Sequence, residues 1–292
     1  EVAGATGGVS VDLGDSDGTN AVLNGAPGII ISSDSLVEIE DVTGTAYNDT
    51  ITGDLLDNRL YGGGGDDVIM GMSGKDLLDG GAGNDILMGG RDSDILIGGA
   101  GSDLLYGYSA DPALVDLVGK DTASYVTSTV GVSVSLATGT GTVGDAADDT
   151  LTGISNLTGS AHNDILTGDA NDNLLIGGAG NDVIDGGAGY DMVSYQDSIS
   201  GVNANLTTGT ASDGFGATDT IIGIENLRGS DFNDILTGNA VENYLRGGAG
   251  NDILDGGAGN DYLDGEAGDD LLKDSAGDDR LDDQELSGLV VE

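Results

Sequence analysis

The chain has 292 residues, of which 55 are glycine, two are proline and none is cysteine or tryptophan. Its 52 Asp and Glu residues outnumber eight Lys and Arg residues, so the formal net charge is −44. This charge repels nucleic acid and anionic membranes, the missing thiols exclude disulfides and thiolate metal sites, and no apolar run is long enough to span a membrane. A chain this acidic needs bound cations to be stable in a compact state.

The first segment, residues 1–43, is predicted to be a β leader, because apolar residues alternate in "GVSVDL" from Gly8. The chain starts at Glu1 without an initiator Met or a signal peptide, which indicates a fragment or a processed product.

From Gly44 onward the sequence repeats every nine residues in the pattern G-G-x-G-x-D-x-U-x, where U is a large apolar residue. Three blocks of such units occupy residues 44–106, 159–194 and 229–282. Residues 107–158 and 195–228 are predicted to be β linkers, because alternating apolar residues occur in both at an offset of 70 positions. Residues 283–292 form a C-terminal tail.

Each nonapeptide favours a glycine-rich turn followed by a very short strand, since only its last three positions lack turn-forming residues. In a strand the eighth-position Leu or Ile points inward while its two neighbours point outward. Two units then complete one circuit, so residues 18 apart, such as Asp67 and Asp85, stack on neighbouring rungs. We therefore predict an all-β solenoid whose core is a thin column of Leu and Ile.

The sixth-position Asp residues would form columns along both edges of this solenoid, beside carbonyl groups of the turns. Such columns repel unless a hard cation lies between the rungs. Calcium accepts about six to eight carboxylate and carbonyl oxygens in flexible geometry, whereas magnesium keeps its waters and zinc prefers nitrogen and sulfur ligands that this chain almost lacks. The pattern therefore indicates calcium.

The repeats resemble those of the RTX (repeats-in-toxin) family, whose fold is a right-handed parallel β-roll, a β-helix solenoid. This resemblance implies that the carbonyls of positions two and four and the Asp of one unit share an ion with the unit 18 residues later. The later unit contributes the carbonyls of positions one and three and its own Asp. Pairs of units at this spacing give about 11 expected Ca²⁺ sites.

The resemblance assigns candidate ligands residue by residue. In the first block they are Gly63, Gly65, Asp67, Asp76, Gly80, Ala82, Asp85, Gly89, Asp94, Gly98, Ala100 and Asp103. In the second block they are Asp164, Gly177, Ala179, Asp182, Gly186, Ala188 and Asp191. In the third block they are Asp234, Gly247, Gly248, Ala249, Gly250, Asp252, Gly256, Gly257, Ala258, Gly259, Asp261, Gly265, Ala267, Asp270 and Asp279. The first two units of each block lack the second and fourth glycines, and Asn58, Asn173 or Asn243 replaces the second Asp. We predict that these units are capping rungs with partial or no metal.

Catalysis is not expected, because His162 is the only histidine and its register favours a packing or rim role. The resemblance implies a secreted, extracellular protein that leaves the cell unfolded by type I secretion and folds when it meets calcium. Two functions remain open. One is a structural or adhesive module with cell-surface or polysaccharide partners, and the other is the calcium-binding C-terminal region of a larger secreted protease, lipase or alginate-modifying enzyme. The oligomeric state is also open.

Overall fold

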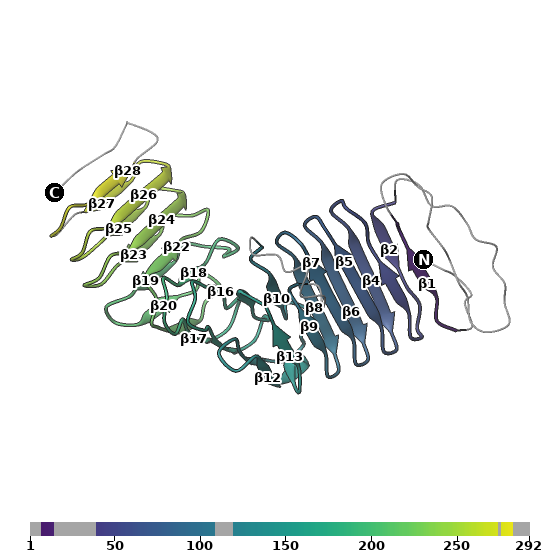
Figure 1. The fold of residues 1–292 in the computed structure, drawn as a ribbon. Coiled ribbons are helices and arrows are strands. Elements are labelled where there is room, and N and C mark those ends of the chain that lie inside the picture. Colours follow the sequence, from purple (N-terminus) through teal and green to yellow (C-terminus); the bar gives the residue numbers. More distant parts are fainter. Residues whose placement is uncertain (1–6, 15–38, 109–118, 274–275, 283–292) are drawn as a thin grey trace. The chain divides into compact units, whose positions relative to one another are not determined.

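The computed structural model describes residues 7–14, 39–108, 119–273 and 276–282, in which almost all regular structure is β-strand (Figure 1). The helical segment among these residues is the short 3-10 turn η2 (Gly144–Ala146), and no described helix is long and apolar enough to cross a membrane. Contacts divide the chain into two compact units, residues 1–128 with 132–156, and residues 129–131 with 157–292. The seven segments drawn from the repeat register stay a prediction, and the tail 283–292 lies outside the described residues.

The repeats of unit one alternate between two parallel sheets. The first sheet contains β1 (Ser10–Asp12), β3 (Thr50–Thr52), β5 (Val68–Met72), β7 (Ile86–Gly90) and β9 (Leu104–Tyr106). The second contains β2 (Asp41–Thr43), β4 (Arg59–Gly64), β6 (Leu77–Ala82), β8 (Ile95–Ala100) and β10 (Thr122–Ser124). Neighbouring strands pair residues 18 apart, as Val68 pairs with Ile86, because two nonapeptides complete one circuit. The predicted parallel β-roll is confirmed.

The segment after the first block of repeats adds further strands to the first sheet of unit one. These are β11 (Ser133–Ser135), β12 (Thr140–Val143) and β13 (Thr150–Thr152). β12 runs antiparallel to both of its neighbours, whereas β13 is parallel to β9 and sets Leu151 opposite Leu105. The segment therefore supplies a rung of the roll with Gly144 at the first position of its turn, but without the second and fourth glycines of the repeat. β14 (Asn156–Thr158) follows at the boundary between the units.

Unit two is built in the same way. Its first sheet has the order β15 (Ile165–Thr167), β17 (Val183–Asp185), β21 (Thr218–Ile222), β20 (Thr210–Ser212), β19 (Asn203–Asn205), β23 (Ile235–Thr237), β25 (Ile253–Asp255) and β27 (Leu271–Lys273). Its second sheet has the order β16 (Leu174–Ile176), β18 (Met192–Ser194), β22 (Asn226–Arg228), β24 (Tyr244–Ala249), β26 (Tyr262–Ala267) and β28 (Arg280–Asp282). β20 again runs antiparallel to both neighbours.

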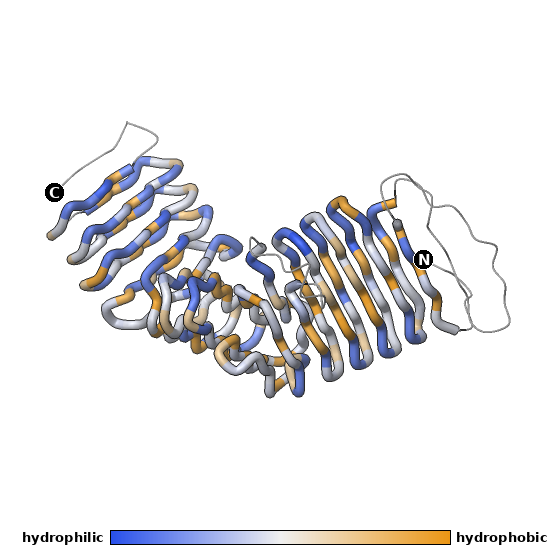
Figure 2. Tube along the Cα trace, in the orientation of Figure 1, coloured by the Kyte–Doolittle hydropathy of each residue, from blue (hydrophilic) through white to orange (hydrophobic). Residues whose placement is uncertain are grey.

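The core of each unit is the column of eighth-position side chains, as predicted. Figure 2 shows the short apolar stretches recurring from rung to rung. These side chains are fully buried at Ile51, Leu60, Ile69, Leu78, Leu87, Leu96, Leu105, Leu166, Leu175, Ile184, Val193, Leu236, Leu245, Leu254, Leu263 and Leu272. Leu281, in the last unit, is only half-buried. A rung of two three-residue strands cannot bury an apolar face by itself, so stacking of the rungs supplies the core.

Candidate metal centres

The turns of the full repeats have a backbone conformation that favours glycine. Their second and fourth residues take positive φ, for example +99° at Gly81 and +139° at Gly83. A Cβ at either position would collide with the backbone of the preceding rung, and L-residues seldom adopt this φ. Glycine therefore lets successive turns stack closely, with the sixth-position carboxylate at their centre.

The sixth-position carboxylates form a hydrogen-bonded ladder inside the turns. The amide of Asp67 donates to Oδ1 of Asp85 at 2.7 Å, and the amide of Asp85 donates to Oδ1 of Asp103 at 2.8 Å. The same contact recurs in unit two, where the amide of Asp252 donates to Asp270 Oδ1 at 2.8 Å. One oxygen of each carboxylate is therefore used to bind the neighbouring rung.

The second oxygen of these carboxylates is buried without a hydrogen-bond partner. This holds for Oδ2 of Asp67, Asp76, Asp85, Asp94, Asp103, Asp182, Asp191 and Asp252. A Cβ built on Gly62 would collide with both Asp67 Oδ2 and the carbonyl oxygen of Gly80, so these two acceptors face one small space, and Asp67 Oδ2 has no hydrogen-bond partner there. A buried acceptor without a partner is costly. Carboxylate and carbonyl oxygens that converge in this way fit a hard cation such as calcium.

The pKa values of these carboxylates also indicate that each site is stabilised by a bound cation. Burial raises the pKa of Asp67 and Asp76 to about 7, that of Asp94 to about 8 and that of Asp85 to about 6. In unit two, burial raises the pKa of Asp252 to about 7. Desolvation disfavours the charged form, so near neutral pH each site gains stability from a cation or a proton.

In the first two units of each block, the sixth-position side chain has no unpaired oxygen, because a backbone amide of the same unit donates a hydrogen bond to it. The amide of the second residue donates to the sixth-position side chain, from Thr45 to Asp49 Oδ2 at 2.5 Å and from Asp54 to Asn58 Oδ1 at 2.8 Å. The equivalent bonds join Ser160 to Asp164, Asp169 to Asn173, Ser230 to Asp234 and Asn239 to Asn243. The second residue of these units does not take positive φ, and its amide points to the sixth-position side chain. These units therefore have no orphaned oxygen that calls for an ion.

After the first and second repeat blocks, a further aspartate extends the ladder and also accepts a hydrogen bond from a tyrosine hydroxyl. The sequence analysis did not predict this arrangement. Asp149 Oδ1 accepts the amide of Asp103 at 2.8 Å, and its Oδ2 accepts the hydroxyl of Tyr125 at 3.1 Å. In unit two, Asp219 accepts the amide of Asp182 at 3.0 Å and the hydroxyl of Tyr195 at 3.1 Å. A signal was present, because each aspartate stands five residues after a glycine, Gly144 or Gly214, and begins a D-x-U stretch as a sixth-position Asp does, although glycine is absent from the second and fourth positions.

The structure brings the predicted ligands together in pairs 18 residues apart. Asp261 donates its amide to Asp279 Oδ1 at 2.7 Å, and a parallel bridge joins Ala258 to Ala276. No three acidic or histidine side chains converge anywhere in the described residues, so backbone carbonyls would have to complete each coordination shell. The assignment of individual ligands remains a prediction. Asp274, at the first position of the last unit, lies outside the described residues.

Replacing Gly80 by Ala tests the space beside the carboxylate. The new Cβ would collide with Asp85 Oδ2 and would lie 2.7 Å from the Gly98 carbonyl oxygen, where a cation is expected. We expect a higher calcium concentration at the folding midpoint and a loss of about 1–3 kcal/mol in calcium-loaded stability. Gly64→Ala is the matched control, because the nearest atom to its Cβ is 3.7 Å away. Equal calcium midpoints for the two variants, measured by circular dichroism, would contradict the assignment.

Comparison with known families matches these features. The model of the RTX calcium-binding nonapeptide repeat matches residues 39–55, 43–78, 52–87, 79–111, 158–193, 219–240, 241–272 and 264–283. Together these matches cover more than half of the chain. Among curated proteins, none matches. The glycine turns, the stacked carboxylates and the parallel sheets follow the same nonapeptide register, and the chain belongs to the RTX calcium-binding nonapeptide repeat family.

Proposed function

We propose that this chain is an extracellular module that folds when it binds calcium after export, with a structural or adhesive role. RTX repeats bind calcium and are structural rather than catalytic. The observation that carries the proposal is the set of buried Oδ2 atoms without partners in the full repeats. When ionised, each carboxylate is a buried negative charge that a divalent ion would compensate.

The ions belong beside the full turns rather than beside the capping units. In the first block, three pairs of full units lie 18 residues apart and begin at Gly62, Gly71 and Gly80. The first of these would hold an ion between Asp67 and Asp85, with carbonyl ligands from Gly63, Gly65, Gly80 and Ala82. The capping units satisfy the equivalent oxygen with an amide, which supports fewer strongly bound ions than the 11 pairs of units.

Low calcium inside a cell would leave this chain unfolded, which suits export through a narrow channel. Outside the cell, extracellular modules bind calcium at about 10⁻⁴–10⁻³ M. An ion present at tenfold its dissociation constant contributes about 1.4 kcal/mol, so several ions together match the stability of a typical domain. Calcium would therefore decide between the unfolded and folded states.

A calcium titration followed by far-ultraviolet circular dichroism tests this function. We expect no β signal in EDTA, a cooperative gain of β signal at about 10⁻⁴–10⁻³ M calcium, and no gain with magnesium at the same concentrations. Bound calcium counted by equilibrium dialysis should exceed one ion per chain. A chain that is equally folded after exhaustive dialysis against EDTA would overturn the proposal.

A further inference from the structure

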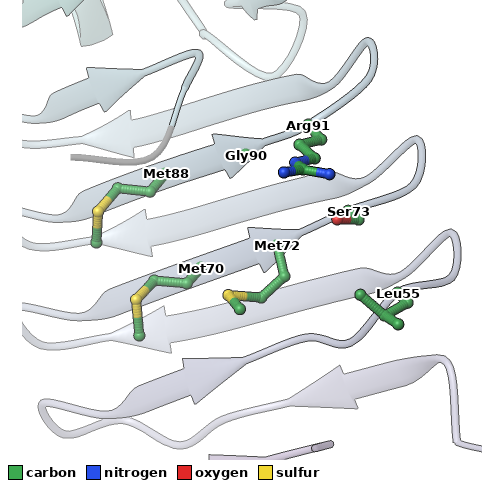
Figure 3. A pocket seen from close by; sticks show the side chains of 7 residues that line it. All are labelled: Leu55, Met70, Met72, Ser73, Met88, Gly90 and Arg91. Carbon is green, nitrogen blue, oxygen red and sulfur yellow. The ribbon is translucent and has the colours of Figure 1, made fainter. Parts of the chain in front are cut away.

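An apolar groove of about 290 Å³ lies on unit one. We call it the methionine groove, and define it by Leu55, Met70, Met72, Met88 and Arg91, with Ser73 and Gly90 between them (Figure 3). Met72 and Ser73 belong to the turn that contains Asp76, and Gly90 and Arg91 belong to the turn that contains Asp94. Its volume is near the lower end of the range for small-molecule sites.

Three of the chain's four methionines line this groove. Met70 and Met88 are partners on neighbouring strands β5 and β7, and each follows an inward-pointing core residue, so both point outward. Met72 is paired with Gly90, where a Cβ would collide with the Met72 carbonyl oxygen, so glycine allows the two turns to approach closely. Methionine side chains are flexible and polarizable, which suits them to an adaptable apolar ligand.

The backbone of Met72 is an outlier. This residue stands at a second position, where the full repeats have glycine, and it keeps a φ of +83°. The other non-glycine residues with positive φ in the described part of the chain are all acidic: Asp92, Asp148 and Glu266. The Met72 side chain is 45% exposed, so core packing does not explain its presence. A strained conformation that presents an apolar side chain to solvent favours a binding role.

One end of the groove carries positive charge. Figure 3 shows Arg91 and Ser73 at the end away from Met70 and Met88, with Met72 between the two ends. Ion pairs in the described residues join Arg246 to Glu266 and Arg280 to Asp282, and none involves Arg91. An exposed guanidinium without an ion pair is suited to a carboxylate, which it can bind through two parallel hydrogen bonds.

We propose that the methionine groove binds a free medium-chain aliphatic carboxylate. The carboxylate pairs with Arg91, and the hydrocarbon chain lies along Met72 toward Met70 and Met88. This site goes beyond calcium binding, but it rests on the calcium-dependent fold, because the turns that form it contain the proposed ions.

Methionine methyl groups report this binding directly. In protein labelled with [methyl-¹³C]methionine and folded in calcium, octanoate should shift the signals of Met70, Met72 and Met88 in a saturable manner. The Met192 signal should not move, because Met192 lies in unit two, outside the groove. Octan-1-ol, which has the same chain without the charge, should bind about tenfold more weakly, the effect of one charge-assisted interaction.

Two variants separate the parts of the groove. Arg91→Gln should lower octanoate affinity about tenfold to that of octan-1-ol. Met72→Gly should abolish saturable binding while keeping the fold, because glycine relieves the positive φ and restores the repeat pattern. Arg228→Gln, in unit two, should change nothing.

Equal shifts at all four methionines, or octanol binding as tightly as octanoate, would overturn the proposal. The circular dichroism of the same sample shows whether calcium has folded the chain. If the fold proves independent of calcium, the octanoate titration can be repeated in EDTA. Failure of calcium-dependent folding can therefore be distinguished from failure of octanoate binding.

Discussion

Replacing Asp85 by Asn will change stability in opposite directions with and without calcium. Asn keeps the Oδ1 atom that accepts the amide of Asp67, and it exchanges the orphaned Oδ2 for an NH₂ group that can donate to the Gly98 carbonyl. Without calcium this removes a buried, unpaired charge, for which we expect a gain of about 1–3 kcal/mol. With calcium, the loss of a charged ligand raises the calcium midpoint, because ligand charge sets affinity.

The experiment compares β signal in EDTA, with a stabilising osmolyte to populate the folded state, against the calcium midpoint of the same variant. Asp49→Asn is the matched control, because Asp49 Oδ2 already accepts an amide from Thr45. Its substitution should weaken the fold slightly in both conditions. An Asp85→Asn chain that loses stability in EDTA as well would rule out the unpaired charge as the reason for calcium dependence.

Acid should partly replace calcium in folding this chain. The folded-state pKa values of Asp67, Asp76 and Asp94 lie at about 7 to 8, above the ordinary value of 3.8. Protons therefore bind the folded state more tightly than the unfolded chain. The stabilisation is complete below the unfolded pKa and is lost as pH rises through the folded values. In EDTA we expect more β signal at about pH 5 than at about pH 8.

Calcium binding should show the opposite trend, because protons and calcium compete for the same oxygens. The calcium midpoint should fall as pH rises from about 6 to about 8, through the pKa values of the buried carboxylates. Working above the isoelectric point of about 4.1 avoids precipitation. A chain that replaces Asp67, Asp85 and Asp103 by Asn is the control, and its response to pH should be smaller. A β signal in EDTA that does not change between these pH values would contradict the prediction.

The repeats predicted the β-roll because each nonapeptide specifies its own turn and its own inward-pointing residue, and the same pattern recurs in every unit. Leu87 and Leu96 each follow an Asp by two positions, and period two within a strand places both in the core. The pairing of residues 18 apart then follows from two turns per circuit, which Val68 and Ile86 confirm. Glycine at positions with positive φ, such as Gly81 and Gly83, could also be expected from its missing Cβ.

The contacts outside the repeats could not be predicted, because they depend on residues far apart in the chain. Nothing local pairs Tyr125 with Asp149 across 24 positions, or orients β12 antiparallel to β11 and β13. In the capping units, the missing glycines predicted weakened metal sites. The replacement bond, from the Thr45 amide to Asp49, depends on which way one peptide group points, and the residue types alone do not fix that.

The amide-to-carboxylate ladder also gives the stack a direction. In every such bond the donor belongs to the earlier rung and the acceptor to the later one, as from Asp67 to Asp85 and from Asp85 to Asp103. At the sixth position, the N-terminal surface of a rung therefore offers a carboxylate oxygen and its C-terminal surface offers an N–H group. A strand added the wrong way round would set like groups against each other, so each rung acts as a template that accepts its successor in a single sense.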